Sequence, residues 1–125
     1  MRKSLIAATL SLLVVSCGLT QREEEFTLGA DRVQLPATVG ATGPLAVAVS
    51  VTVGGCQGFK RFEARRTASA LQLRVVGQRR VGAGVACPAN VAYETHTYTD
   101  PGTPGRTDPF EVSVNGKVAG QVRVQ

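Results

Sequence analysis

Large apolar residues alternate with small or polar residues along much of this chain. The clearest run is Leu45 to Val53, in which odd-numbered positions are leucine or valine and even-numbered positions are alanine, serine or threonine. A period of two places the large side chains on one face of a β-strand, whereas a helix would scatter them around its axis. The pattern therefore predicts a half-buried strand at 45–53.

Shorter runs of the same kind predict further strands, separated by loops rich in glycine and proline. The strands are expected at 26–28, 32–35, 59–67, 71–76, 89–99, 110–114 and 118–124, and the loops at 36–44, 77–88 and 100–109. Asn115-Gly116 supplies the two positive-φ positions of a type I′ turn and predicts a closing hairpin. We expect an all-β chain forming a single antiparallel β-sandwich of about seven strands, with a small closed β-barrel as the alternative.

The first residues follow a different pattern. Arg2 and Lys3 precede an apolar run from Leu5 to Val15, which is the arrangement of a secretory signal. As a helix these 11 residues would be roughly 17 Å long, whereas a membrane's hydrocarbon core is about 30 Å thick. This length disfavours a transmembrane anchor, so we expect residues 1–16 to be a cleaved signal peptide.

Val14-Val15-Ser16-Cys17 resembles the lipobox of bacterial lipoproteins, in which aliphatic and small residues precede an invariant cysteine. The resemblance implies cleavage before Cys17, a diacylglycerol thioether on its sulfur and an acyl chain such as palmitate on its amino group. Two or three acyl chains hold a protein firmly on a membrane. The resemblance therefore implies a bacterial cell-envelope protein that faces the periplasm or exterior. The alternatives are an ordinary signal peptide with an incidental Cys17 and an uncleaved signal anchor.

Cleavage before Cys17 would leave 109 residues, enough for one domain with a modest core. Residues 17–25 are expected to be the lipidated cysteine and a short polar tether that ends in Glu23-Glu24-Glu25. This tether would span at most about 25–30 Å. Residues 26–125 would form the β domain, held close to its membrane.

Cys56 and Cys87 remain once Cys17 is lipidated. In an oxidising compartment a disulfide between them is the expected state. Closing a loop of about 30 residues would stabilise the fold by roughly 3 to 4 kcal/mol. A zinc site is disfavoured because His96 is the only histidine and the cysteines lack ligand spacing. We expect no metal and no cofactor.

A second resemblance covers residues 44–125. It rests on Gly54-Gly55-Cys56 after a valine-rich strand, on Cys87, and on the closing hairpin of Phe110, Val112, Val114, Asn115 and Gly116. These features resemble the immunoglobulin-like or transthyretin-like sandwiches of small bacterial lipoproteins, although the chain has no tryptophan, unlike antibody-type domains. The resemblance implies a scaffold or binding role.

Candidate catalytic residues are few. Glu94, His96 and Tyr98 share one face of a predicted strand, but no Gly-x-Ser-x-Gly elbow accompanies them. Asp100 and Asp108 precede prolines, as turn residues do, and nothing in the sequence indicates that either carboxylate is buried. We therefore expect no enzyme; a small hydrolase using His96 is the disfavoured alternative.

Basic residues gather between positions 60 and 80, which we call the basic face. Its members are Lys60, Arg61, Arg65, Arg66, Arg74, Arg79 and Arg80, and the segment contains one acid, Glu63. Arginine's fork of donors suits carboxylates and phosphates. The hypothesis is a non-enzymatic binding or scaffold module that contacts anionic lipid, polysaccharide or an acidic envelope protein, with nucleic acid disfavoured by compartment. The alternatives are charges that protect a sheet edge and a structural accessory subunit of an envelope complex.

Overall fold

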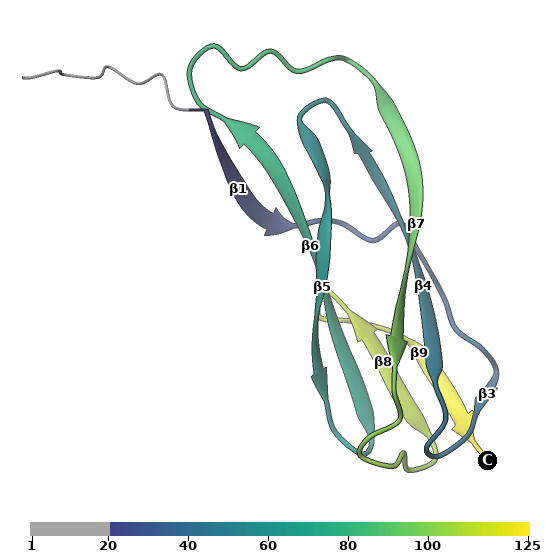
Figure 1. Cartoon of the computed structure of the whole chain (residues 1–125). Coiled ribbons are helices and arrows are strands. Elements are labelled where there is room, and N and C mark those ends of the chain that lie inside the picture. The colour runs from purple at the N-terminus through teal and green to yellow at the C-terminus, as the bar shows by residue number, and fades with distance from the viewer. Residues whose placement is uncertain (1–20) are drawn as a thin grey trace, which may run out of the picture.

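The computed structural model describes residues 21–125, which fold as strands, turns and loops (Figure 1). The strands are β1 (Arg22–Thr27), β2 (Arg32–Gln34), β3 (Thr38–Val39), β4 (Leu45–Gly54), β5 (Gln57–Arg66), β6 (Ala70–Val81), β7 (Val91–Asp100), β8 (Phe110–Val114) and β9 (Lys117–Val124). The all-β prediction is confirmed for these residues. The expected signal peptide at 1–16 and the lipobox cysteine Cys17 lie outside them.

The nine strands of the described residues belong to one sheet. Their hydrogen-bonded order is β2-β4-β5-β6-β8-β9-β3, with β1 added to β6 and β7 added to β4. The pairs β6–β8 and β3–β9 are parallel, and the other pairs are antiparallel. The sheet is therefore mixed and not wholly antiparallel as predicted. The long connection through β7 returns the chain beside β6 in the same direction, which a tight hairpin cannot do.

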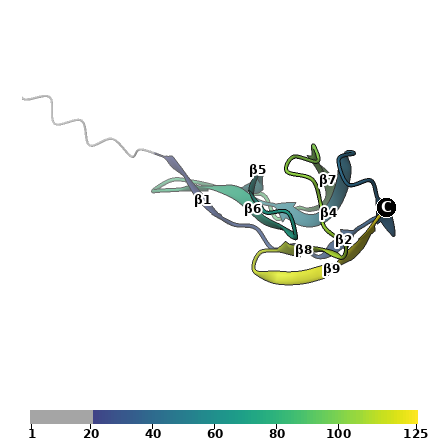
Figure 2. The ribbon, with the colours of Figure 1, turned by 90° about the horizontal axis from the view of Figure 1, so that it is seen from below.

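The sheet curls into an open half-barrel around one core. β4 and β5 pair only through Gly54 and Gln57, so the two strands diverge from the tip of their hairpin. Figure 2, an end-on view, shows β8 and β9 on one side of the curl and β4 and β7 on the other. Within residues 21–125 the only strand that pairs with β7 is β4, so the curl does not close into the alternative barrel.

The alternating pattern of β4 supplies one side of the core. Every odd-numbered residue from 45 to 53 is buried, as predicted, and packs in one cluster with Leu71, Leu73 and Val75 of β6. Phe110, Val112 and Val114 of β8 join the same cluster. Burial of each such side chain contributes about 1.5 to 3 kcal/mol. The core is therefore what holds the two halves of the curled sheet together.

The two-residue β3 lies in the predicted loop 36–44, and two longer stretches predicted as tether or loop are strands as well. Residues 22–25, which the sequence analysis assigned to a tether, begin β1, and β1 pairs with residues 76–81 of β6. Residues 77–81, assigned to a loop, continue β6. Neither stretch has an alternating apolar pattern, which is why both were missed. Opposite charges face each other instead, because Glu23 lies opposite Arg80 and Glu24 opposite Arg79.

Asn115 and Gly116 form the predicted turn between β8 and β9, with φ angles of 53° and 78°. The side chain of Asn115 has a second role. Its Nδ2 donates to the carbonyl oxygen of Leu28 at 2.9 Å, and its Oδ1 accepts from the Val75 amide at 2.9 Å. Since β1 and β8 pair with different stretches of β6, Asn115 fills the interval between them.

Candidate functional site

The basic face lies on β5 and β6, which are antiparallel neighbours. Five of its seven cations have a carboxylate partner within 4 Å: Lys60, Arg61, Arg66, Arg74 and Arg79. The acids come from β1, from β5 and from the end of β7. The concentrated positive field expected from the sequence is therefore largely balanced within the chain itself.

Glu25 of β1 is the central acid of the exposed pairs. Lys60 Nζ donates to Glu25 Oε1 at 2.7 Å, while Arg61 donates through Nη1 at 2.9 Å and Nη2 at 2.8 Å. The hydrogen bonds from Arg61, and then those from Lys60, lower the pKa of Glu25 from 4.5 to about 2. The predicted tether thus supplies an acid that ties β1 to the basic face.

Two further exposed pairs continue this pattern. Arg79 Nη2 lies 3.5 Å from Glu24 Oε2, and Arg74 Nη1 lies 2.6 Å from Glu63 Oε1. Arg74 Nε also donates to Thr27 Oγ1 at 2.8 Å. Pairs this exposed contribute at most about 1 kcal/mol each, so their main effect is on the surface charge.

Arg65 and Arg80 are the two members of the basic face that have no carboxylate within 4 Å among the described residues, and both are exposed. Arg65 lies opposite Gln72, eight residues before Arg80 on β6. At about 3.3 Å per residue this separates the two positions by roughly 26 Å. The unpaired positive charge of the basic face therefore lies at two separate positions.

An open depression of about 800 Å³ lies beside Arg65 on the sheet surface. Its lining residues are Thr27, Glu63, Ala64, Arg65, Gln72, Leu73, Arg74, Glu111, Ser113, Asn115, Gly116 and Val118. Arginine, glutamine and serine side chains offer hydrogen-bond donors there, and two glutamates limit the positive charge. The depression suits a polar ligand with a localised negative group rather than a uniformly anionic surface.

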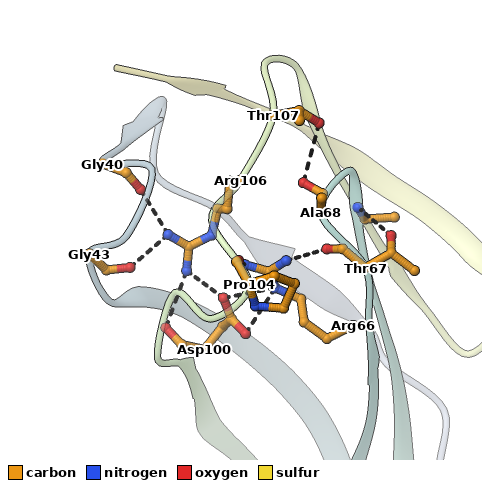
Figure 3. Close-up of polar contacts among 10 residues, drawn as sticks. Gly40, Gly43, Arg66, Thr67, Ala68, Asp100, Pro104, Arg106 and Thr107 are labelled. Atoms are coloured by element: carbon orange, nitrogen blue, oxygen red, sulfur yellow. Dashed lines mark hydrogen bonds and ion pairs between the residues drawn. The ribbon is translucent and has the colours of Figure 1, made fainter.

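Arg66, although predicted as part of the basic face, belongs to a buried cluster (Figure 3). Its side chain is 11% exposed, and its Nε lies 3.1 Å from both carboxylate oxygens of Asp100. Arg106, with a side chain that is 0% exposed, donates to the same carboxylate from the other side. Asp100 itself is 1% exposed. One buried carboxylate is thus held between two guanidinium groups.

The same arginines fasten the loop that follows β7. Arg106 Nη1 donates to the carbonyl oxygens of Gly40 at 2.8 Å and Gly43 at 2.6 Å, and Arg66 Nη2 donates to Pro104 O at 2.7 Å. Both guanidinium groups also lie over the ring of Phe110. The cluster therefore joins β5, the loop 101–109 and the connection between β3 and β4, which is a structural role.

The prediction that Asp100 is an ordinary turn residue was wrong, and no role was predicted for Arg106. The sequence contains no local signal for this cluster, because Asp100 meets Arg66 across a separation of 34 residues. A buried charge is stable only when its partners neutralise it, and those partners come from the fold.

The structure joins Cys56 and Cys87 in a disulfide with a Cα–Cα distance of 5.1 Å, in agreement with the predicted pairing. The bond ties the connection between β6 and β7 to the β4–β5 turn. Gly54 in this turn has a φ of 151°, and a Cβ there would lie 2.0 Å from the carbonyl oxygen of Asn90. Glycine is therefore required for the close approach of the two segments.

His96 lies on the inner face of β7. Its Nε2 is 3.0 Å from Glu94 Oε1, and its ring stacks on Phe59 of β5 with the centroids 3.8 Å apart. Tyr98 meets Phe62 edge-on at 5.8 Å. The shared face of Glu94, His96 and Tyr98 was predicted; His96 and Tyr98 on it are half-buried against β5, while Glu94 is exposed. These contacts give His96 a packing role beside β5.

The opposite face of β7 is exposed along the whole strand. Tyr93 is 82% exposed and Val91 is 66% exposed, and Thr95, Thr97 and Thr99 extend the same face. Within the described residues the second edge of β7 has no strand partner. A strand of ten residues with one free edge is a place where another chain's strand can add.

Residues 21–125 form no helix long and apolar enough to cross a membrane. In this part of the chain no three histidine, cysteine, aspartate or glutamate side chains are grouped as metal ligands. The chain matches no protein-family model, no curated protein and no solved structure.

Proposed function

We propose that this chain is a lipid-anchored protein of the bacterial cell envelope that works as a non-enzymatic binding or scaffold module. The anchor rests on the lipobox-like residues 14–17 and on the short apolar run before them. Intact mass spectrometry of the protein from its own membrane tests the anchor, because acylation adds a diacylglycerol and an acyl chain to a chain that starts at Cys17. An unmodified chain that starts at Met1 would disprove it.

The observation that carries the binding role is the unpaired Arg65 at the rim of the open depression on β5 and β6. Arg65 has donors beside it in Gln72 and Ser113 and lies roughly 26 Å along the sheet from Arg80. The ligand proposed for this site is a carboxylate or phosphate group of an envelope polysaccharide or of an acidic protein patch. Anionic lipid suits the Arg80 end better, because Arg80 lies beside the uncharged residues Ala86 and Pro88.

The test compares Arg65→Ala with Arg32→Ala. Arg32 is also exposed, but it lies on β2 and does not line the depression. Binding to acidic envelope polysaccharide, measured at low and high salt, should weaken for Arg65→Ala and stay unchanged for Arg32→Ala. Equal binding by the two variants and the parent protein would mean that the depression beside Arg65 is not the binding site.

A second candidate function, a structural accessory subunit of an envelope complex, is supported by the free edge of β7. A partner strand would pair with the backbone there, and its side chains would lie beside Tyr93 and Thr95. Co-purification with an envelope partner should then persist at high salt and be lost on Tyr93→Lys. Salt-sensitive co-purification that Tyr93→Lys leaves intact would exclude this candidate.

The finer description of the fold as an immunoglobulin-like sandwich of about seven strands is also a proposal. It is supported by the single point of pairing between β4 and β5 and by the core shared between the two halves. Under this description β4, β2 and β7 would be one sheet and the remaining strands the other.

A further inference from the structure

The start of β1 and the connection between β6 and β7 lie at the same end of the molecule (Figure 1). Arg22, the first residue of β1, pairs with Val81, the last residue of β6. The connection, residues 82–90, begins at the next position, and we call it the β6–β7 loop. The chain therefore enters the domain beside this loop.

The β6–β7 loop is apolar and exposed. Residues 82–90 read Gly-Ala-Gly-Val-Ala-Cys-Pro-Ala-Asn and contain no charged side chain, and Asn90 is their only polar side chain. Ala83, Ala86, Pro88 and Ala89 are exposed, and Val85 is half-buried. Because its exposed residues are small and uncharged, the loop can lie against a membrane surface without burying a charge.

The loop is also held in place. The Cys56–Cys87 disulfide fixes its middle to the β4–β5 turn. The amide of Gly55 donates to the backbone oxygen of Asn90 at 3.1 Å, and to its side-chain Oδ1 at 3.1 Å. The apolar residues are consequently presented on a firm support at one end of the sheet.

The distance from the expected anchor is short. Because β1 begins at Arg22, only residues 18–21 separate it from Cys17. At no more than about 3.6 Å per residue, the Cα atom of Arg22 lies within about 18 Å of the Cα atom of Cys17. This is shorter than the tether predicted from the sequence, and it leaves the domain little freedom to turn its other end toward the membrane.

Cations flank the loop. Arg80 lines a shallow depression of about 410 Å³ together with Cys56 and Pro88, and Arg79 and Glu23 line it as well. Arg22 adds a further positive charge, and Glu23 and Glu24 leave the local excess small. The apolar loop, with Arg80 beside it, is thus the part of this end that best matches a membrane interface.

We propose that the β6–β7 loop rests in the interface of the membrane that carries the lipid anchor, with Arg80 at the head-group phosphates. This inference rests on the proposed anchor at Cys17. A membrane surface, and not a protein, is the expected occupant because the chain that leads to the acylated cysteine leaves the domain beside the loop.

The absence of tryptophan from the chain provides a clean test. Val85→Trp and Ala83→Trp each place a single tryptophan in the loop. Thr103→Trp is the control, because it places a tryptophan past the other end of β7, and this ten-residue strand is about 33 Å long. The acylated protein, purified from its own membrane, is bound to vesicles of phosphatidylethanolamine and phosphatidylglycerol, with or without lipids brominated on their acyl chains. Both loop variants should show a blue-shifted emission that brominated lipid quenches, and Thr103→Trp should show neither effect.

The outcomes separate the loop from the anchor. If the protein is acylated and sediments with vesicles, but both loop variants emit like Thr103→Trp and resist quenching, the membrane contact is overturned and the anchor stands. If mass spectrometry finds no acyl chain and the protein stays in the supernatant, the proposed anchor fails and the loop inference falls with it. Quenching of all three variants would also overturn the proposed orientation.

Discussion

Two groups of basic residues in this protein pair with carboxylates in opposite surroundings. Arg66 and Arg106 hold Asp100 where the carboxylate is 1% exposed, whereas Lys60 and Arg61 hold Glu25 at the open surface. The partners and distances are similar, but the energetic roles differ. In the interior, loss of a partner leaves an uncompensated charge, while at the surface water replaces the partner.

This comparison explains why a run of basic residues is a poor guide to a binding surface. Arg66 lies directly after Arg65 in sequence, yet Arg66 turns inward to Asp100 and Arg65 faces the depression. Alternation along β5 gives neighbouring residues opposite faces. A basic segment can therefore contain structural, neutralised and available cations side by side.

The largest effect is expected at the buried cluster. Asp100→Ala should lower the free energy of unfolding by about 3 to 5 kcal/mol, because Arg106 would stay buried without its counter-charge. Urea denaturation with the disulfide intact measures this. Asp108→Ala is the matched control, since Asp108 also precedes a proline but is exposed. An equal loss for both variants would contradict the assigned role of the cluster.

A smaller effect is expected from the disulfide, which ties the opposite end of the sheet. The Cys56→Ser/Cys87→Ser double variant should lose about 2 to 4 kcal/mol, because the bond closes a loop over a sequence separation of 31. Thermal unfolding with and without reductant is the measurement. Reductant should bring the parent protein down to the level of the variant, and an unchanged midpoint would argue against an intact bond.

At the exposed pair of Glu63 and Arg74 the expected change is at most about 1 kcal/mol. Glu63→Ala should shift the urea midpoint slightly, and high salt should remove the difference from the parent because the pair is open to solvent. A loss of stability comparable to that of Asp100→Ala would mean that burial does not make the interior ion pairs more important for stability than the exposed ones.

The smallest effect concerns the protonation of Glu25. Because its pKa is lowered from 4.5 to about 2, its contribution to stability is complete above pH 4.5 and is lost as the pH falls through about 2. A carboxyl-carbon NMR titration should place its midpoint well below those of other glutamates, and Arg61→Ala should raise it. A titration midpoint of Glu25 near that of other glutamates in the parent protein would mean that Glu25 does not join β1 to the basic face.

Much of the fold was predictable where one face of a strand is apolar. The odd positions of β4 are buried as their pattern indicates, β8 covers the predicted 110–114, and Asn115-Gly116 forms the expected turn. β1 was not predictable in this way, because its pairing with β6 relies on facing charges and not on a period. For the candidate site, the positions of the cations were predictable, but their partners were not.

The amino-acid sequence alone determined that the described chain is all β, where its main strands alternate, and which cysteines can pair. These are local or compositional properties, since a two-residue period and a glycine turn act over a few positions. Only the tertiary structure decided that Asp100 is buried between Arg66 and Arg106, that the acidic run becomes β1, and which arginines stay unpaired. Each of these depends on groups far apart in the chain, and burial sets whether a charge is structural or open to a partner.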